Sequence, residues 1–579
     1  MKKLKEYLPL WDLIKKDKIK LLFASIIIFI AGLSSIFTGY LNGAAIEAVT
    51  NNSIKNAITY LGIYFFIELF VEGYLYLLGH KMLLKVESKL TRTISFEAYK
   101  KSLNLPAVAY EKYSSGEIIN RITSDAETLS FTFKQLLEMV AHLISTIIIF
   151  IYILFNSIII SLYILLFMLV LIIVVKKYTP IMKKVNKERK KGQDRFVAIT
   201  TESIRGIREI KTLGIKHNLI KDVRDIIKYL LNKSYKEVDV DNKFRIITKT
   251  LRATMEVGTF ILCAILVYYQ QISLTFFIAM TYYIYRFMYL IDSIEGLTQT
   301  YQRVSVALGR VNEILQNRLY NDVKFGNKKL VNPKGIIEFK NVSFAYPKEK
   351  QTLNDFSLSI ESNKKIAIVD KSGQGKSTLF NLITRIFDAK KGKITIDGIN
   401  IKEICEDDLR KEVSIIRQEP FIFNRSIKDN FKLINPKLTL EQIRKYTKMA
   451  YLDDYIMSLP KGYDTLLGEG GVNLSGGQKQ RLSIARTLAK ESKIILFDEA
   501  TSALDNESQE YIKKSIDNLI KDHTVVIVAH RLSTIIDADI IHVVDQGKIV
   551  ASGKHEELLK NSKIYKNLYE TESLNSKEI

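Results

Sequence analysis

Long apolar runs in the first half of the chain place the strongest limit on its fold. The stretches "LISTIIIFIYIL" and "SIIISLYILLFMLVLIIVV" both lie before residue 180, and the second half has no comparable run. A helix that crosses a bilayer needs about 20 apolar residues, because its side chains contact hydrocarbon. The first half is therefore predicted to be a helical membrane domain.

Six membrane-spanning helices are predicted, at residues 19–41, 57–79, 137–155, 157–176, 253–271 and 273–293. The short turns between the third and fourth spans and between the fifth and sixth spans carry no Lys or Arg. In contrast, "MKKLKEY" at the start and "KKYTPIMKKVNKERKKGQDR" after the fourth span are densely basic. The positive-inside rule then predicts a multi-pass protein of a bacterial-type cytoplasmic membrane, with both termini and the long loops in the cytoplasm.

Much of the net charge of +23 is assigned to these basic segments. They are expected to contact anionic lipid headgroups, so membrane lipid is a predicted partner and nucleic acid is not. The two long loops, at about 80–136 and 177–252, are rich in Lys, Glu, Ile and Leu at helical spacing. They are predicted to be cytoplasmic extensions of the membrane helices.

The sequence pattern changes near residue 333. From there on, short segments rich in β-branched residues, such as "KKIAIVD" and "GKITIDG", alternate with segments of helical pattern. This pattern predicts an α/β domain. The predicted organisation is an all-α six-helix transmembrane domain at residues 1–320, with long cytoplasmic extensions, followed by an α/β domain at residues 321–579.

The segment "VDKSGQGKST" follows an apolar strand and precedes a helix, the context of a phosphate-binding loop of pattern G-x-x-x-x-G-K-[ST]. Backbone N–H groups of such a loop bind phosphate oxygens. Lys376 is predicted to reach the β- and γ-phosphates of ATP, and Ser377 to bind Mg²⁺. The residues assigned to ATP are Asp370, Lys371, Ser372, Gly373, Gln374, Gly375, Lys376, Ser377 and Thr378.

Asp370 stands where the pattern has its first glycine. The main role of that glycine is backbone shape, and Asp tolerates turn conformations. One carboxylate about 8 Å from a phosphate costs about 2 kcal/mol at an effective dielectric of about 20. We therefore expect an active ATPase that binds ATP somewhat more weakly.

Two further strands end in polar residues. In the segment "KIILFDEATSALD", an apolar strand is followed directly by two carboxylates. Burial of two charged groups is unfavourable unless a cation or a reaction uses them. Asp498 is predicted to hold Mg²⁺ through water, and Glu499 to act as the general base for the attacking water. "HTVVIVAH" ends in His530, which is predicted to contact the γ-phosphate.

The string "LSGGQKQRLSIARTLAK", residues 474–490, completes a set of motifs that resembles ATP-binding cassette (ABC) transporters, and specifically exporter-type half-transporters. The resemblance implies that Tyr346 stacks on adenine and that Gln418 senses Mg²⁺ and the membrane domain. It also implies that Ser475, Gly476, Gly477 and Gln478 close on the nucleotide of a partner. Two coupling helices are expected near 114–123 and 213–221.

The resemblance implies ATP-driven export or flipping of a substrate by a dimer, with ATP and Mg²⁺ as cofactors. The chain holds one phosphate loop and one signature, so the partner is a second copy or a related half-transporter. A weakly catalytic member of a heterodimer is the alternative, and import or regulation remains open. The sequence does not indicate the transported substrate.

Charged residues lie deep within two of the predicted spans: Glu68 and Glu72 in the second and Arg286 in the sixth. Such residues usually face the protein interior or a water-filled path. Glu72 and Arg286 lie at similar depth, which predicts either an ion pair or a charged substrate cavity. The tyrosines near Arg286 are expected to line that cavity.

Overall fold

The computed structural model describes residues 15–113, 115–316, 323–346, 352–370, 376–468, 471–498, 506–520, 522–528 and 532–575. The chain divides into two compact units. The first contains Met1–Leu105 and Lys112–Tyr320, and the second contains Pro106–Glu111 and Asn321–Ile579.

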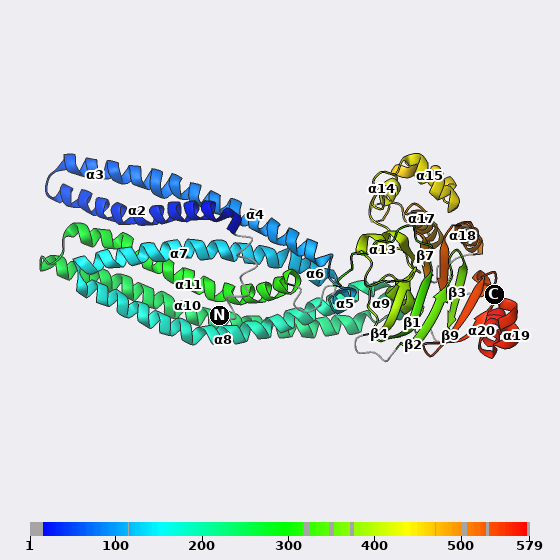
Figure 1. Cartoon of the computed structure of the whole chain (residues 1–579). Helices are drawn as coiled ribbons and strands as arrows, with labels where there is room; N and C mark the ends of the chain where they lie inside the picture. Colours follow the sequence, from blue (N-terminus) through cyan, green and yellow to red (C-terminus); the bar gives the residue numbers. More distant parts are fainter. Residues whose placement is uncertain are drawn as a thin grey trace. The chain divides into compact units, whose positions relative to one another are not determined.

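Long helices make up most of the first unit (Figure 1). They are α2 (Lys18–Thr50), α3 (Ile54–Phe66), which continues through the π-helix η2 (Ile67–Leu75) into α4 (Tyr76–Ser102), α7 (Ser124–Asn156), α8 (Ile158–Arg205), α10 (Lys216–Tyr268) and α11 (Leu274–Leu315). Within the described residues, five helical runs, which begin at Lys18, Ile54, Ser115, Ile158 and Lys216, are long and apolar enough to cross a membrane. The predicted helical membrane region is confirmed.

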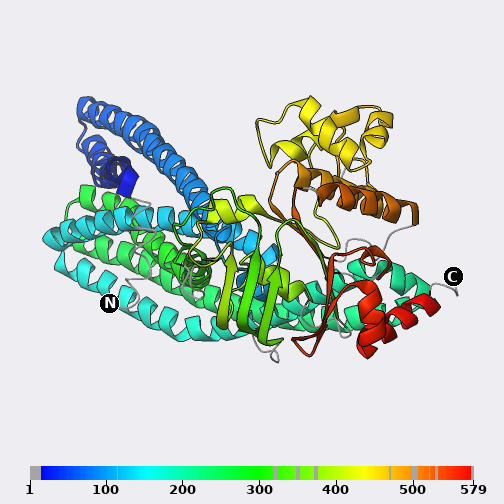
Figure 2. The ribbon, with the colours of Figure 1, turned by 45° about the vertical axis from the view of Figure 1, so that its right-hand side comes forward.

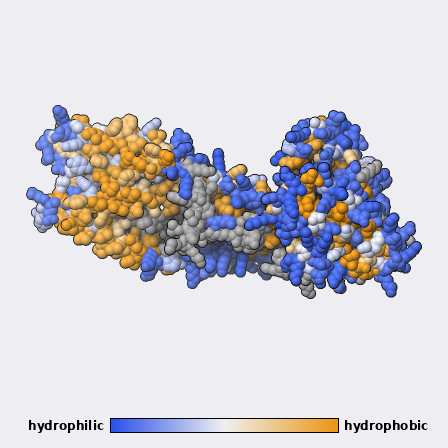
Figure 3. All heavy atoms as spheres, in the orientation of Figure 1, coloured by the Kyte–Doolittle hydropathy of each residue, from blue (hydrophilic) through white to orange (hydrophobic). Residues whose placement is uncertain are grey.

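Helix lengths exceed what a bilayer needs. α8 has 48 residues and α10 has 53, which at 1.5 Å per residue gives roughly 70–80 Å. Large apolar side chains remain exposed on these helices, and Figure 3 shows such side chains gathered on the surface of the bundle. An exposed apolar surface of this kind suits contact with lipid.

Close packing between α2 and α11 depends on small residues. A Cβ atom added at Gly43 would lie 2.3 Å from the carbonyl oxygen of Thr275, and one added at Gly39 would lie 2.9 Å from the ring of Tyr283. Small residues at such positions let membrane helices approach closely, which increases their van der Waals contact.

Short helices connect the long ones: α5 (Ala107–Lys112), α6 (Ser115–Ile122) and α9 (Ile207–Leu213). α6 lies within the segment expected near 114–123. The second short helix lies earlier than the expected 213–221: α9 ends at Leu213, and the residues from Lys216 onward belong to the long helix α10. Gly214 ends α9 in the left-handed conformation (φ 68°), which glycine adopts without a Cβ clash.

The second unit contains two sheets. The strands are β1 (Ile337–Phe344), β2 (Leu353–Ile360), β3 (Lys365–Asp370), β4 (Lys391–Ile396), β5 (Ile399–Asn400), β6 (Val413–Ile416), β7 (Ile494–Asp498), β8 (Thr524–Val528), β9 (Ile540–Asp545) and β10 (Lys548–Gly553). One sheet has the order β2-β1-β4-β5, and its strands are antiparallel. The other has the order β10-β9-β3-β8-β7-β6. Its neighbouring strands run parallel to each other, except that β10 is antiparallel to β9.

Helices cover the parallel sheet. They are α12 (Lys376–Ile383), α13 (Glu406–Glu412), α14 (Ile427–Lys432), α15 (Leu440–Met449), α16 (Asp453–Ser458), α17 (Gly476–Leu488), α18 (Asn506–Leu519), α19 (His555–Asn561) and α20 (Lys563–Asn575). The short 3₁₀ segments η1 (Lys15–Asp17), η3 (Gly462–Asp464) and η4 (Leu532–Thr534) complete the described elements.

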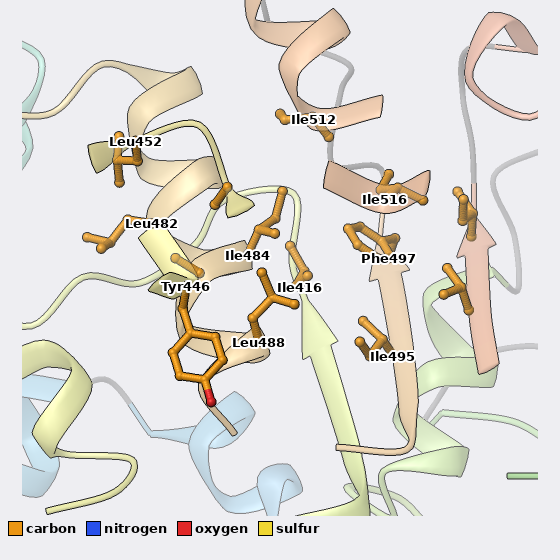
Figure 4. Close-up of a cluster of buried hydrophobic side chains, with 14 of the residues drawn as sticks. Ile416, Tyr446, Leu452, Leu482, Ile484, Leu488, Ile495, Phe497, Ile512 and Ile516 are labelled. Atoms are coloured by element: carbon orange, nitrogen blue, oxygen red, sulfur yellow. The ribbon is translucent and has the colours of Figure 1, made fainter. Parts of the chain in front are cut away.

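Alternate residues of the parallel strands fill two different cores, because successive side chains point to opposite faces of a sheet. Ile495 and Phe497 of β7 pack with α14–α20, and Figure 4 shows Ile484 and Leu488 of α17 beside Ile416 of β6. Ile494 and Leu496 pack instead with α12, α13 and the antiparallel sheet. Figure 2 shows the green strands of the second unit side by side. Both faces of the parallel sheet are thus covered by apolar side chains. Polar groups that bind a ligand can therefore lie only at the ends of the strands.

Candidate functional site

Three neighbouring parallel strands end at one edge of the second unit. Asp370 is the last residue of β3, Asp498 the last of β7, and Val528, opposite Asp498, the last of β8. Ligands of α/β sheets bind outside the carboxyl ends of the strands. The segments that follow these three strands are 371–375, 499–505 and 529–531, so Lys371, Ser372, Gly373, Gln374, Gly375, Glu499 and His530 lie outside the described residues.

Ser377 and Asp498 are brought together at this edge. The hydroxyl of Ser377, in the first turn of α12, donates a hydrogen bond of 3.2 Å to Oδ1 of Asp498. Asp498 is only 8% exposed, whereas the Ser377 residue is exposed. A hydroxyl and a carboxylate are hard oxygen donors, and protein Mg²⁺ sites use few such groups together with substrate phosphates. The pair therefore fits Mg²⁺.

Tyr346, predicted to stack on adenine, is held by α12. Its hydroxyl accepts hydrogen bonds from Oγ1 of Thr378 (3.1 Å) and from Nδ2 of Asn381 (3.2 Å). Its ring packs edge-on against Phe344 and Phe387. Thr378 is 3% exposed, so its hydroxyl orients the aromatic residue rather than facing solvent. Asn381 was missed, because nothing in its local sequence indicates a tyrosine 35 residues away.

Asp370 belongs to the strand rather than to a turn. It pairs with Val544 of β9 in the parallel ladder, and its side chain is buried (9% exposed). It is not among the described residues with positive φ. The backbone at this position is therefore extended, and an aspartate occupies it without the conformational freedom of glycine.

The signature segment forms a capped helix start. Oγ of Ser475 accepts a hydrogen bond of 3.2 Å from the backbone N–H of Gln478, and Oε1 of Gln478 accepts one of 2.8 Å from the N–H of Ser475. Beyond this capping box, the N–H groups of Gly476 and Gly477 in the first turn have no partner within the helix. Such groups, at the positive end of a 13-residue helix, attract phosphate.

The same helix also holds the Gln418 segment. Nε2 of Gln480 donates to the backbone carbonyls of Arg417 (2.9 Å) and Gln418 (3.1 Å), and Arg486 donates to the carbonyl of Phe421 (3.0 Å). Gln480 is 2% exposed. The signature helix therefore fixes the backbone around Gln418. The sequence signal for Gln480 is a polar residue on the buried face of an amphipathic helix.

In the first unit, Glu72 and Arg286 do not form an ion pair within one chain, which was one of the two alternatives that the sequence left open. Oε1 of Glu72 accepts from the hydroxyls of Ser34 (3.0 Å) and Thr38 (3.3 Å). Nε of Arg286 donates instead to Oγ of Ser35 (3.1 Å). Adjacent residues of an α-helix point about 100° apart, so Ser34 and Ser35 direct the two charges to different sides of α2.

Comparisons with known proteins agree with this organisation. Residues 21–318 match the family model described as the ABC transporter transmembrane region, and residues 353–502 match the one described as ABC transporter. The ATP-dependent lipid A-core flippase of Haemophilus influenzae (strain 86-028NP) is 31% identical over 576 residues, which cover 98% of this chain and 97% of the relative.

The multidrug export ATP-binding/permease protein YgaD of Bacillus subtilis (strain 168) is 33% identical over 473 residues, which cover 80% of this chain and 81% of the relative. The fold is similar to that of a bacterial Atm1-family ABC exporter with ATP bound, with a TM-score of 0.81 at 22% identity, over 96% of this chain and 98% of that one.

A membrane region, a phosphate-loop edge and a capped signature helix thus occur in one polypeptide that is similar to exporters over nearly its whole length. The chain belongs to the ABC transporter family, as a fused transmembrane and ATPase chain that hydrolyses ATP to drive transport.

Proposed function

We propose that the chain works as a homodimeric exporter or flippase with two equivalent ATP sites. Each site combines the phosphate-loop edge of one copy with the signature helix of the other. The observation that carries this proposal is that one chain supplies both halves: the Ser377–Asp498 pair and the capped start of α17, where the N–H groups of Gly476 and Gly477 have no partner within the helix. Because it has one of each, two copies would complete two sites.

An apolar groove in the first unit supports the proposal that a second copy of the chain binds there. Residues of α8, α9 and α10 line a groove of about 610 Å³, among them Ile204, Ile207, Leu219, Ile220 and Ile227. Ile204 is 69% exposed, and Leu213, the last residue of α9, is 68% exposed. These residues lie in the predicted cytoplasmic extensions, where lipid does not cover them. Exposed apolar patches of this kind mark protein interfaces.

Each residue has a proposed role in hydrolysis. Lys376 binds the β- and γ-phosphates, Tyr346 stacks on adenine, and Ser377 with Asp498 holds Mg²⁺, which neutralises phosphate charge when bound. Glu499 orients the attacking water and accepts its proton. The predicted orientation, with both termini and the ATPase domain in the cytoplasm, gives these groups access to cellular ATP.

The deciding experiment uses the full chain purified in lipid nanodiscs. We expect ATP hydrolysis by the chain without another protein, and a particle mass that corresponds to two copies. Glu499→Gln should reduce turnover at least a hundredfold while it retains ATP binding, because Gln keeps the shape but cannot accept the proton. Glu491→Gln, an exposed residue before β7, is the matched control and should keep full turnover.

Two results would contradict the proposal. A fully active single copy would show that one chain completes its own site. A dimeric wild-type chain that binds but does not hydrolyse ATP would favour the weakly catalytic partner of a heterodimer. Asp370, which stands where the loop pattern has its first glycine, is the feature that favours such a weakly catalytic partner.

A further inference from the structure

One short helix, α12, carries side chains for both parts of the proposed nucleotide site. Its first residues, Lys376 and Ser377, belong to the phosphate-loop motif. Thr378 and Asn381 of the same helix donate hydrogen bonds to the hydroxyl of Tyr346, the proposed adenine-stacking residue. Lys376 and Asn381 are five residues apart, which is about 8 Å along the helix axis. The proposed base site and the phosphate site are therefore attached to one rigid element.

The contacts of its hydroxyl define the direction of the Tyr346 ring. Both aromatic neighbours are nearly perpendicular to this ring, at interplanar angles of 85° for Phe344 and 86° for Phe387. Apolar contacts fill space without a strict direction, whereas a hydrogen bond weakens steeply when its angle changes. A phenylalanine at this position would keep the packing. What the hydroxyl adds is the link to α12.

Asn381 supports Tyr346 in two ways. Nδ2 of Asn381 donates directly to the tyrosine hydroxyl at 3.2 Å. In addition, the backbone carbonyl of Asn381 accepts from the N–H groups of Ile386 (2.9 Å) and Phe387 (3.3 Å), and the Phe387 ring packs against Tyr346 with ring centroids 5.2 Å apart. Only the direct contact uses the side chain of Asn381, so a substitution can remove it while the backbone contacts remain.

We propose that Asn381 is a positioning residue for nucleotide binding. It fixes the Tyr346 ring at a set distance from the phosphate site, so that the base and the triphosphate of one nucleotide bind at the same time. This inference rests on the proposed stacking of Tyr346 on adenine, and it names a residue that makes the stacking effective. A ring that is already oriented loses little freedom when the base binds, which increases affinity.

A purely structural role of Asn381 would have a different consequence. Loosening of α12 would disturb Lys376 and Ser377 as well, so it would weaken phosphate binding and lower kcat. A positioning role changes only the binding of ligands that have a base, because the phosphate contacts do not pass through Asn381. A nucleotide and its counterpart without a base therefore separate the two roles.

The test compares ATP with ribose 5-triphosphate, which has the sugar and the triphosphate but no base. The full chain in lipid nanodiscs is used to measure KM and kcat for ATP and the inhibition constant of ribose 5-triphosphate against ATP turnover. We expect the wild type to bind ATP more tightly than ribose 5-triphosphate. Asn381→Leu should raise the KM for ATP about fivefold, the effect of one lost hydrogen bond. It should leave kcat and the inhibition constant nearly unchanged.

Two further variants sharpen the comparison. Tyr346→Phe removes the hydroxyl and keeps the ring, so it should also raise the KM for ATP alone. The double variant Asn381→Leu/Tyr346→Phe should bind ATP like Tyr346→Phe, because the two changes remove a shared contact. Asn561→Leu, at the exposed end of α19, is the matched control and should behave like the wild type. Tyr346→Phe also provides the test if Asn381→Leu does not fold.

An unchanged KM for ATP in Asn381→Leu and in Tyr346→Phe would overturn the assignment. An equal loss of affinity for ribose 5-triphosphate would overturn it too, because it would show a general disturbance of α12. A wild type that binds both ligands equally well would instead contradict the proposed adenine contact of Tyr346. That result needs no variant, so the failure of the stacking proposal and the failure of the Asn381 role are distinguishable.

Discussion

Ser377 in the first turn of α12 donates a hydrogen bond to Asp498 at the end of β7, so residues 121 positions apart share one polar edge. The pair predicts how the enzyme depends on Mg²⁺. Asp498→Asn keeps the size of the side chain and removes its charge, so we expect the Mg²⁺ concentration for half-maximal ATPase to rise at least tenfold.

The matched control for this change is Asp522→Asn, which alters an exposed residue before β8. It should leave the Mg²⁺ dependence unchanged. A Mg²⁺ titration of ATPase activity checks both variants. Equal Mg²⁺ dependence in Asp498→Asn and the wild type would exclude Asp498 from the metal site.

Asp370 should weaken ATP binding without lowering the maximal rate. Because its backbone is extended, the electrostatic cost can be separated from backbone shape by two substitutions. Asp370→Asn removes the charge alone and should lower the KM for ATP several-fold with kcat nearly unchanged. Asp370→Gly should give a similar KM and in addition destabilise the strand by about 0.5–1 kcal/mol.

Steady-state kinetics and thermal unfolding of both variants provide the check. A large rise in kcat on Asp370→Gly, from a nearly inert wild type, would show that the native chain is a degenerate partner. The same KM in all three proteins would place the carboxylate out of reach of the phosphates.

Gln480 is expected to position the Gln418 segment. Gln480→Leu removes both hydrogen bonds to the carbonyls of Arg417 and Gln418 and leaves these acceptors unsatisfied. We expect kcat to fall about tenfold while ATP affinity changes less than twofold, since no phosphate contact is lost. Lys479→Ala, at the neighbouring position of α17, is the control.

Single-turnover hydrolysis and nucleotide binding, measured on the same samples, separate the two effects. If the loss appeared only in ATP affinity, Gln480 would act on nucleotide binding. If both variants lost stability equally, the role would be general packing of α17.

Asp453 should stabilise the second unit in a pH-dependent way. Burial opposes its ionisation, but hydrogen bonds from Arg444 (3.1 Å) and Tyr463 (2.5 Å) outweigh burial and hold the pKa of Asp453 below its usual value. A folded-state pKa below the unfolded one gives stability that is present above the unfolded pKa, near 4. That stability is lost as the pH falls through the folded pKa.

Asp453→Asn should therefore lower the free energy of unfolding by about 1 kcal/mol at pH 7 and by less near pH 3, because it weakens hydrogen bonds to a charged group whose partner Arg444 is partly exposed. Calorimetry of the full chain in detergent over this pH range measures the difference. Asp454→Asn changes the adjacent exposed carboxylate and should have little effect at either pH. A pH-independent loss in Asp453→Asn would assign the effect to packing alone.

The sequence by itself determined the large-scale organisation of this protein. Apolar runs such as "SIIISLYILLFMLVLIIVV" require helices in a bilayer, and "KKIAIVD" before a glycine-rich loop requires a strand at a phosphate site. These features can be read from the sequence because each one depends on residues that are neighbours in a single segment: about 20 apolar residues for a membrane helix, and eight residues for a phosphate loop. Fold class, family and ATP-driven transport follow from them.

Only the tertiary structure decided which side chains meet. Ser34 and Ser35 hold Glu72 and Arg286 apart, so similar depth in the membrane did not produce an ion pair. Gln480 meets carbonyls more than 60 residues away. The rotation of each helix about its axis determines such contacts, and that rotation depends on packing against distant segments. No local pattern records it.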